Sequence, residues 1–152
     1  MKIGFIGLGR MGSRMVMNLN DHEINVVAYN KSAEVCRPFS KLGMEIACSI
    51  GELASKLPGK KIIWLMVTAG KPVDSVIGHL APYLKKGDII IDGGNSFYKD
   101  SIRRYKFLKR KGIHFLDIGT SGGLEGARYG ACLTIGGDFN IFKKIEWLCK
   151  MI

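Results

Sequence analysis

The sequence predicts an α/β domain with a doubly wound, mostly parallel β-sheet, and three observations support this prediction. Short apolar, β-rich runs alternate with stretches of helical periodicity along the chain. The first of these runs leads directly into a glycine-rich loop and then into a helical stretch. No internal repeat, low-complexity tract or linker interrupts the 152 residues, which are enough for one domain with a substantial core.

The individual elements follow from this alternation. Seven runs are typical of strands: Lys2–Ile6, Ile24–Tyr29, Met44–Ala47, Lys61–Met66, Asp88–Ile91, His114–Asp117 and Cys132–Ile135. Five helical patterns lie between them: Met11–Leu19, Ala33–Leu42, Ile50–Lys56, Pro72–Leu80 and Asp100–Lys111. Ser49 and Glu52 have the spacing of a capping box at the start of the third helix. Strands separated by helices in this way favour βαβ units and a parallel sheet.

The first predicted strand is followed by Gly7-Leu8-Gly9-Arg10-Met11-Gly12. In a dinucleotide-binding turn, the first glycine makes the tight turn, the second leaves room for phosphates, and the third lets the helix pack on the strand. The following helix offers free N–H groups to a pyrophosphate. This context disfavours a plain strand–turn–helix without a ligand. We therefore predict a Rossmann-type domain in which a dinucleotide contacts Gly7, Leu8, Gly9, Arg10, Met11 and Gly12.

In such a domain, residues at the end of the second strand contact the adenosine ribose. A carboxylate there selects NAD, whereas a cation accommodates the 2′-phosphate of NADP. This chain has Asn30, Lys31 and Ser32 at that place, and no carboxylate. Lys31 can pair with a phosphate as a point charge, so the sequence favours NADP, with NAD as the other candidate. If Asn30 simply ends the strand in a turn, the preference stays open.

Two further strand ends are expected at the same edge of the sheet, where ligands bind in open α/β sheets. The fourth strand leads into Val67, Thr68 and Ala69, which we predict to contact the cofactor. The fifth leads into the sequence Asp-Gly-Gly-Asn-Ser of residues 92–96, in which the Asn95 amide suits a hydroxyl or carboxamide partner. An ordinary loop is the alternative interpretation of this second segment.

A second glycine-rich segment, residues 119–130, is predicted to form a loop beside this edge. Glycines allow successive N–H groups to converge into an anion-binding nest, and Ser121 adds a hydroxyl group. A flexible connection is the alternative. It accounts for the glycines but not for the ordered run that follows over residues 131–137.

The chain has 23 Lys and Arg residues against 13 Asp and Glu residues, which gives a net charge of +10. In the densest basic cluster, Ile102, Tyr105 and Leu108 recur at helical spacing, so we expect the basic residues to form a solvated helix face. They are Arg103, Arg104, Lys106, Lys109, Arg110 and Lys111. The second interpretation of this charge is an electrostatic field that attracts anionic small molecules. Nucleic acid ranks third and is not a predicted partner, because no binding module or aromatic platform accompanies the charge.

The remaining composition excludes several classes of site. Cys36, Cys48, Cys132 and Cys149 lack metal-site spacing, and no metal is predicted. No apolar run approaches the roughly 20 residues of a membrane span. The N-terminus also lacks the pattern of a secretory signal. We therefore expect a soluble, cytoplasmic protein without a membrane partner.

The end of the chain carries an apolar helical stripe, which starts after Asp138. Its members are Ile141, Ile145, Leu148, Cys149 and Ile152. Because the chain stops on two apolar residues without a cap, we expect the natural protein to continue. The stripe would then be uncovered in this chain and would favour self-association. A short protein with a frayed last turn is the alternative.

Four segments, taken together and in order, resemble the cofactor domain of 6-phosphogluconate dehydrogenase, within the β-hydroxyacid dehydrogenases. They are G-L-G-x-M-G (7–12), L-M-V-x-A-G (65–70), D-G-G-N-S (92–96) and S-G-G-x-x-G-A-x-x-G (121–130). They span nearly the whole chain, and the third separates this branch from 3-hydroxyisobutyrate dehydrogenase relatives. Members often carry Arg where Lys31 stands, and Lys lacks the planar group that stacks on adenine.

The resemblance implies a role for each segment. Residues 7–12 would hold the pyrophosphate, residues 30–32 would surround the adenosine end, and Val67 and Ala69 would flank the cofactor. The implied substrate contacts are Asn95, which also lies next to the cofactor, and Ser121, Gly122 and Gly123. The catalytic lysine and proton-donating glutamate of the family would lie beyond Ile152, so no catalytic residue is assigned in this chain.

The implied activity is NADP-dependent oxidative decarboxylation of 6-phosphogluconate, a phosphorylated sugar acid, to ribulose 5-phosphate in the pentose phosphate pathway. Residues 1–152 would be the NAD(P)-binding domain, inactive alone, and the helical C-terminal domain of the family would be absent from this chain. The full-length protein would be a homo-oligomer. Two alternatives stay open: another β-hydroxyacid dehydrogenase, such as a 3-hydroxyisobutyrate dehydrogenase-like enzyme, and a non-catalytic nucleotide-sensing module.

Overall fold

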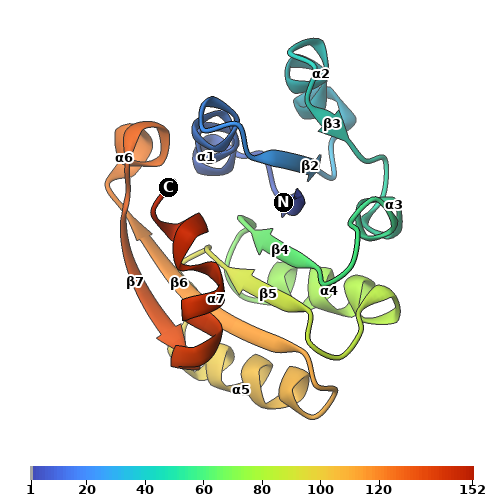
Figure 1. Ribbon diagram of the computed structural model, residues 1–152, viewed down its shortest axis with the longest axis vertical. Coiled ribbons are helices and arrows are strands. Elements are labelled where there is room, and N and C mark those ends of the chain that lie inside the picture. Colours follow the sequence, from blue (N-terminus) through green and yellow to red (C-terminus); the bar gives the residue numbers. More distant parts are fainter. Residues whose placement is uncertain (1) are drawn as a thin grey trace.

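The secondary structure follows the alternation of the sequence (Figure 1). The computed structural model describes residues 2–152, in which seven strands alternate with seven α-helices and one short 3-10 helix. The strands are β1 (Lys2–Ile6), β2 (Asn25–Tyr29), β3 (Glu45–Ile46), β4 (Ile62–Leu65), β5 (Ile89–Asp92), β6 (His114–Ser121) and β7 (Cys132–Gly137). The helices are α1 (Arg10–Asp21), α2 (Ala33–Lys41), α3 (Ile50–Ser55), α4 (Lys71–Leu80), η1 (Ala81–Tyr83), α5 (Tyr98–Lys109), α6 (Gly123–Tyr129) and α7 (Phe139–Cys149). None of the helices in residues 2–152 has the length and apolar character needed to cross a lipid bilayer.

All seven strands of this part of the chain form one sheet, in the order β3-β2-β1-β4-β5-β6-β7. The first six are parallel, and β7 runs antiparallel to β6. The chain begins in the middle of the sheet, builds outward through β2 and β3, and continues with β4 on the other side of β1. The winding therefore reverses between β1 and β4, which makes the ends of these strands the topological switch point.

Helices cover both faces of the sheet, so its central strands are buried on both sides. Side chains alternate between the faces: Ile62 and Trp64 join one core cluster, and Ile63 and Leu65 join the other. Helices α1, α2, α6 and α7 contribute to the first cluster, and α3, α4 and α5 contribute to the second. The continuous apolar runs of β4 and β5 reflect this double burial.

The structure confirms the predicted α/β fold, and each predicted strand and helix overlaps an observed one. The predicted capping of α3 is present as well. The Glu52 N–H donates a hydrogen bond to Ser49 Oγ at 3.0 Å, and the Glu52 carboxylate accepts one from the Cys48 N–H at 2.7 Å. The largest differences from prediction lie in the last third of the chain.

The prediction of a loop over residues 119–130 is wrong. Residues 119–121 extend β6 and pair with β7, and residues 123–129 form α6. Gly122 and Gly130, with φ angles of +120° and +138°, flank this helix at its two ends. Ala127 is the residue of this helix that is buried in the core. The glycines therefore shape the two ends of a short helix, because they adopt backbone conformations that other residues rarely reach.

The apolar stripe near the end of the chain belongs to α7 and is covered, which contradicts the expectation of an exposed face. Its buried members are Ile141, Ile145, Leu148 and Ile152. The Asn18 amide of α1 donates a hydrogen bond to the Met151 carbonyl oxygen at 3.0 Å. Burial raises the pKa of the half-buried Cys149 thiol to about 11. The stripe thus completes the core of this domain and offers no surface for self-association.

Candidate cofactor site

The glycine loop after β1 lies against the end of β4 with no room for side chains. Gly7 has a φ of +103°, and a Cβ atom on it would lie under 3.0 Å from the Met66 carbonyl oxygen. A Cβ atom on Gly12 would lie under 3.0 Å from the Gly7 carbonyl oxygen. Both positions therefore require glycine because the backbones of β1, α1 and β4 approach so closely.

Gly9 has different surroundings. Apart from Gly9 itself and its two chain neighbours, no atom of residues 2–152 lies within 4 Å of the point where its Cβ atom would stand. The residue is exposed, and it precedes α1 at a helix start that no side chain caps. A side chain at this position would therefore extend into open space beside the free N–H groups of the first helical turn. The position fits the close approach of a phosphate group, because protein does not fill that space.

Asn30 ties the glycine loop to the end of β2. Its Oδ1 atom accepts a hydrogen bond from the Leu8 N–H at 3.0 Å, and its Nδ2 atom donates one to the Ser32 carbonyl oxygen at 3.3 Å. Asn30 therefore does more than end the strand, since its amide holds the loop in place. Lys31 and Ser32 are exposed beside it.

A cavity of about 340 Å³, here called the switch-point cavity, opens between the glycine loop and the ends of β4 and β5. Its lining residues are Gly9, Arg10, Met11, Gly12, Met66, Val67, Gly93, Gly94, Asn95 and Thr120. The structure thus brings together six residues predicted to contact the cofactor: Gly9, Arg10, Met11, Gly12, Val67 and Asn95.

The other predicted site residues do not line this cavity. Gly7 and Leu8 are buried within the loop, while Asn30, Lys31 and Ser32 lie at the end of β2. The remaining ones are exposed, either after β4 or where β6 passes into α6: Thr68, Ala69, Ser121, Gly122 and Gly123. Asn95 and Ser121 were expected to face one cleft, and only Asn95 lies on the cavity wall.

Asn95 connects the loop after β5 to β6. It adopts a φ of +53°, in the left-handed region that Asn tolerates better than most residues. Its Nδ2 atom donates a hydrogen bond to the Thr120 carbonyl oxygen at 3.3 Å. The preceding Gly94 pairs with Gly119 in an isolated β-bridge, and a Cβ atom on Gly94 would lie 2.6 Å from the Val67 carbonyl oxygen. This wall of the cavity is therefore built by close backbone contacts.

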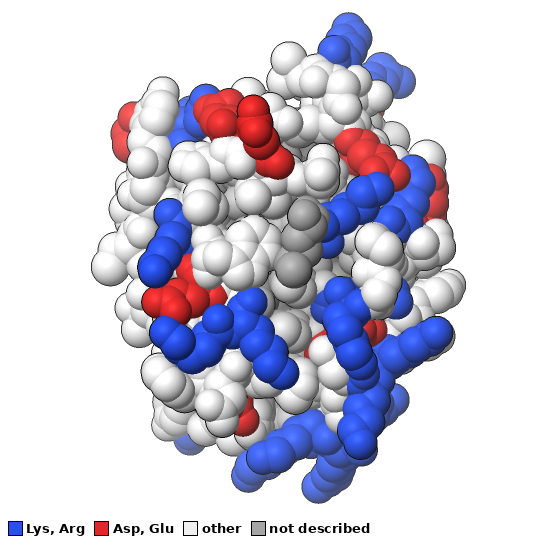
Figure 2. Space-filling view, viewed as in Figure 1, with Lys and Arg blue, Asp and Glu red and all other residues white. Residues whose placement is uncertain are grey.

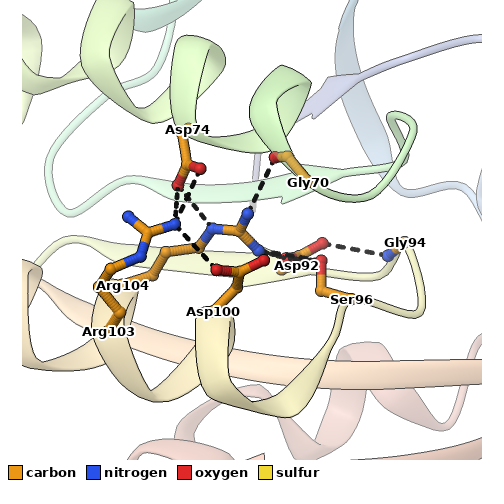
Figure 3. A network of polar contacts seen from close by, with 8 residues as sticks. All are labelled: Gly70, Asp74, Asp92, Gly94, Ser96, Asp100, Arg103 and Arg104. Atoms are coloured by element: carbon orange, nitrogen blue, oxygen red, sulfur yellow. Dashed lines mark hydrogen bonds and ion pairs between the residues drawn. The ribbon is translucent and has the colours of Figure 1, made fainter.

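A buried ion-pair network lies beside this loop (Figure 3). Arg104 of α5 was expected on a solvated helix face, but it is only 2% exposed, so that prediction is wrong. Its guanidinium donates hydrogen bonds to Asp74 at 2.8 Å, to Asp92 at 3.2 Å and to the Gly70 carbonyl oxygen at 2.9 Å. The physical reason is the helix orientation: the buried positions are 101, 104 and 108, whereas Ile102 is 49% exposed.

Asp92, at the end of β5, is fully buried and satisfied on both carboxylate oxygens. Its Oδ1 atom accepts a hydrogen bond from the Gly94 N–H at 3.2 Å. Its Oδ2 atom accepts one from the Ser96 hydroxyl at 2.7 Å and one from Arg104. The first residue of the D-G-G-N-S motif therefore fixes the loop that carries Asn95. Through Gly70 and Asp92, Arg104 also connects the two loops that follow β4 and β5.

Asp74 and Arg103 form the outer, partly exposed end of the network. The hydrogen bond from Arg104 lowers the pKa of Asp74, burial opposes this effect, and Arg103 lowers the pKa further. Arg103, which is 57% exposed, contacts Asp74 at 2.9 Å and Asp100 at 3.1 Å. The pKa of Asp74 is therefore lower than that of an ordinary Asp carboxyl, and its ion pairs with Arg103 and Arg104 join α4 to α5.

Sequence reasoning missed Met66, Gly93, Gly94 and Thr120 of the cavity, and Asp74, Asp92 and Arg104 of the network. One signal for the network was present. Asp92 is a carboxylate that directly continues an apolar run, and a buried charge at such a place requires a partner. The spacing of residues does not reveal which of many cations supplies it.

Comparisons with known proteins agree with this geometry. A family profile described as the NAD binding domain of 6-phosphogluconate dehydrogenase matches residues 2–152. The decarboxylating 6-phosphogluconate dehydrogenase 1 of Saccharomyces cerevisiae is 48% identical over 154 residues, which cover 98% of this chain and 32% of that enzyme. The decarboxylating enzyme of Cunninghamella elegans is 46% identical over 155 residues, 99% of this chain and 32% of that enzyme. A Bacillus subtilis (strain 168) relative is 45% identical over 150 residues, and the chain spans only 50% of it.

Solved structures show the same relationship. The 6-phosphogluconate dehydrogenase of Plasmodium falciparum, solved in apo form, with NADP+ and with 6-phosphogluconate, matches with a TM-score of 0.91 and 32% identity over 98% of this chain and 33% of that one. A Mycobacterium tuberculosis 3-hydroxyisobutyrate dehydrogenase matches with a TM-score of 0.91 at 20% identity, over 99% of this chain and 51% of that one, and so shares the fold. The chain therefore belongs to the family of the NAD-binding domain of 6-phosphogluconate dehydrogenase, an NAD(P)-binding oxidoreductase domain of Rossmann type.

Proposed function

We propose that this chain is the NADP-binding domain of an enzyme that oxidatively decarboxylates 6-phosphogluconate to ribulose 5-phosphate. The observation that carries the proposal is the meeting of the glycine loop, the end of β4 and Asn95 in the switch-point cavity. The names of the yeast and Cunninghamella relatives support it, as does the Plasmodium structure with NADP+ and 6-phosphogluconate. The expected catalytic lysine and glutamate lie outside residues 1–152 in this proposal.

The glycine loop is the proposed binding site of the cofactor's pyrophosphate. Asn30 already occupies the Leu8 N–H, so the first turn of α1, from Arg10 to Gly12, supplies the remaining donors. The open space at Gly9 leaves room for a phosphate group there. When bound, the nicotinamide group supplies the electron acceptor for oxidation of a secondary alcohol.

The other proposed contacts surround this centre. Val67 lies on the cavity wall, and the exposed Thr68 and Ala69 continue from it along the proposed cofactor path. Asn95, which also lines the cavity, is assigned to both cofactor and substrate. Ser121, Gly122 and Gly123 form the proposed outer contact with a phosphorylated sugar acid. They are exposed at the start of α6, outside the cavity.

The preference for NADP rests on Lys31, which is exposed beside the loop that Asn30 holds. One charge-assisted contact to the 2′-phosphate is worth about 1.5–3 kcal/mol. We expect NADP to bind more tightly than NAD, and Lys31→Ala to remove most of the difference. Titration of both cofactors by calorimetry measures it, with the exposed Lys41→Ala as the matched charge control. Equal or tighter binding of NAD by the unmodified chain contradicts this assignment.

The reaction itself is tested on the full-length protein. We expect NADPH formation with 6-phosphogluconate, none with 3-hydroxyisobutyrate, and no turnover by residues 1–152 alone. Turnover with the unphosphorylated acid instead would favour the other β-hydroxyacid dehydrogenases, and tight NADP binding without turnover of either would favour a nucleotide sensor. Assembly as a homo-oligomer stays a prediction, which sedimentation of the full-length protein checks.

A further inference from the structure

A second and larger cavity lies at the opposite edge of the sheet, where β1, β4, β5 and β6 begin. Its volume is about 910 Å³, and its charged lining residues are Lys2, Lys60, Lys86 and Lys144, with His114 among them. We call it the lysine cavity. None of its lining residues is acidic. In Figure 2, lysine and arginine side chains outnumber acidic ones over the lower half of the face shown.

Most of this positive charge is not neutralised within the described part of the chain. Lys2 pairs with Glu45 at 2.7 Å, but residues 2–152 provide no ion pair for Lys60, Lys86 or Lys144. The nearby carboxylate of Asp88 is buried and already accepts hydrogen bonds from the N–H groups of Lys61 and Lys85. Three of the lysines that line the cavity therefore have no carboxylate partner among residues 2–152.

The lysine side chains are held in place by the backbone around them. The Lys60 ammonium donates a hydrogen bond to the Lys86 carbonyl oxygen. Gly87 and Gly112 are joined by a hydrogen bond of 2.8 Å, and each leaves the space that a lysine side chain uses. A Cβ atom on Gly87 would lie 2.6 Å from Lys60 Nζ, and one on Gly112 would lie 2.7 Å from Lys86 Cγ. The two glycines thus let the lysines lie against the turn backbone.

His114 also lines the lysine cavity, and its surroundings lower its pKa. Burial lowers its pKa, the charges of Lys144 and Lys60 lower it further, and only Asp138 acts in the opposite direction. Tyr105 and Lys109 are the other titratable groups that share a small neighbouring cavity with it. Burial and the nearby Lys144 thus disfavour the charged form of this imidazole.

We propose that the lysine cavity binds a small soluble anion that carries two or more phosphate groups. Lysine binds phosphate as a strong point charge, and three unpaired ammonium groups need more than one negative charge to be neutralised. The cavity is concave and has Ile62 and Ile89 on its lining, but it offers no Phe, Tyr or Trp on which bases of a nucleic acid could stack. The site is distinct from the switch-point cavity and is independent of the function proposed above.

The test uses sodium tripolyphosphate as the probe and the 152-residue chain. We expect saturable one-to-one binding by calorimetry, and weaker binding of inorganic phosphate. The triple variant Lys60→Gln/Lys86→Gln/Lys144→Gln should lower the affinity at least about tenfold, since each 1.4 kcal/mol corresponds to a factor of ten. The matched control Lys41→Gln/Lys99→Gln/Lys106→Gln removes the same charge from exposed positions elsewhere and should keep most of the affinity.

Two further measurements distinguish a specific site from general charge. The histidine signals of the chain, assigned with His114→Asn, should show a higher pKa for His114 when tripolyphosphate is bound, and NADP should not displace the probe. Circular dichroism and NADP affinity check that the triple variant stays folded. The proposal is overturned by absence of binding, by equal losses in both triple variants, or by a single-stranded RNA that uses these lysines and binds more tightly than tripolyphosphate.

Discussion

The two glycine-rich segments, residues 7–12 and 119–130, resemble each other in the sequence but need glycine for different reasons. In the first, Cβ atoms on Gly7 and Gly12 would lie under 3.0 Å from backbone carbonyl oxygens. In the second, no atom of residues 2–152 beyond the chain neighbours and the backbone of α6 lies within 4 Å of the equivalent point on Gly123 or Gly130, yet their φ angles are +61° and +138°. Gly7 and Gly12 of the first segment need glycine for space, and Gly7 also for its φ of +103°, whereas Gly123 and Gly130 of the second need it for backbone conformation alone.

This difference separates the proposed cofactor loop from a segment whose glycines flank a short helix. Close packing of the first segment against β4 leaves its open side at Gly9, which lines the switch-point cavity. The second segment instead ends one strand and forms a helix of seven residues. Glycine density alone therefore does not identify the loop that binds the cofactor's pyrophosphate. What identifies it is the distance between backbones and the position of the space that remains.

The largest expected effect concerns Arg104, which holds the loops that follow β4 and β5. Replacing it with Met leaves the fully buried Asp92 without its cation, and removing one partner of a buried ion pair costs about 3–5 kcal/mol. We expect urea unfolding of Arg104→Met to show a loss of this size, together with weaker NADP binding. The exposed Arg103→Met is the control and should change stability little. Equal effects of both variants would mean that burial of the Arg104–Asp92 pair carries no special cost.

A comparison within the first segment should have the next largest effect. Gly12→Ala forces a Cβ atom against the Gly7 carbonyl group, and overpacking of this kind costs about 1–3 kcal/mol. Gly9→Ala meets no protein atom, so its free energy of unfolding should change by less than about 0.5 kcal/mol. Its NADP affinity should nevertheless fall about tenfold or more, a loss of 1.4 kcal/mol or greater. If Gly9→Ala left the NADP affinity unchanged, the proposal that this loop binds the pyrophosphate would be wrong.

A smaller effect is expected in the second segment. Gly123 has a left-handed φ of +61° in open surroundings, so Gly123→Ala should cost about 1 kcal/mol, and Gly123→Asn should cost less. Neither variant should alter NADP affinity, which is measured beside thermal unfolding. If NADP binding weakened in both variants, the two glycine-rich segments would share a ligand after all.

The smallest effect concerns acid stability. The pKa of Asp74 is lowered in the folded state, chiefly by its hydrogen bond from Arg104, so its contribution is present above the ordinary Asp pKa and is lost as the pH falls through the lowered value. We expect Asp74→Asn to flatten the decline of stability below about pH 4, the region of the ordinary Asp pKa. Urea midpoints at a series of acid pH values measure this slope. An unchanged slope would show that solvent screens the partly exposed pair completely.

The parallel part of the fold could be predicted because each βα unit there carries its own local signal. Periodicity, the glycine turn and the capping residues Ser49 and Glu52 all act over a few residues. The structure of residues 119–130 could not be predicted, because the same glycines permit both a loop and helix termini. Pairing with β7 makes residues 119–121 part of a strand, and residues 123–129 form a helix between Gly122 and Gly130.

The candidate site, like the fold, could be predicted only in part. The loop positions followed from the rule that ligands bind at the carboxyl ends of the strands, and six of the expected cofactor residues meet in one cavity. The residues that support this cavity could not be predicted by the same rule. The apolar stripe that included Ile102 placed Arg104 on the solvent-exposed face of the helix. A shift of the buried face by one residue places Arg104 inside, and only the packing of α5 on the sheet determines that shift.

The contact between Asn18 and Met151 also has a consequence for the order of folding. These residues are 133 positions apart, so the contact that joins α1 to residue 151 forms only after residue 151 has been synthesised. Contacts of such separation slow folding, because a long loop must close before they contribute. We therefore expect the amide protons of α1 to gain protection late in pulsed hydrogen exchange, after those of α4 and α5. Early protection of α1 would show that the first half of the domain folds on its own.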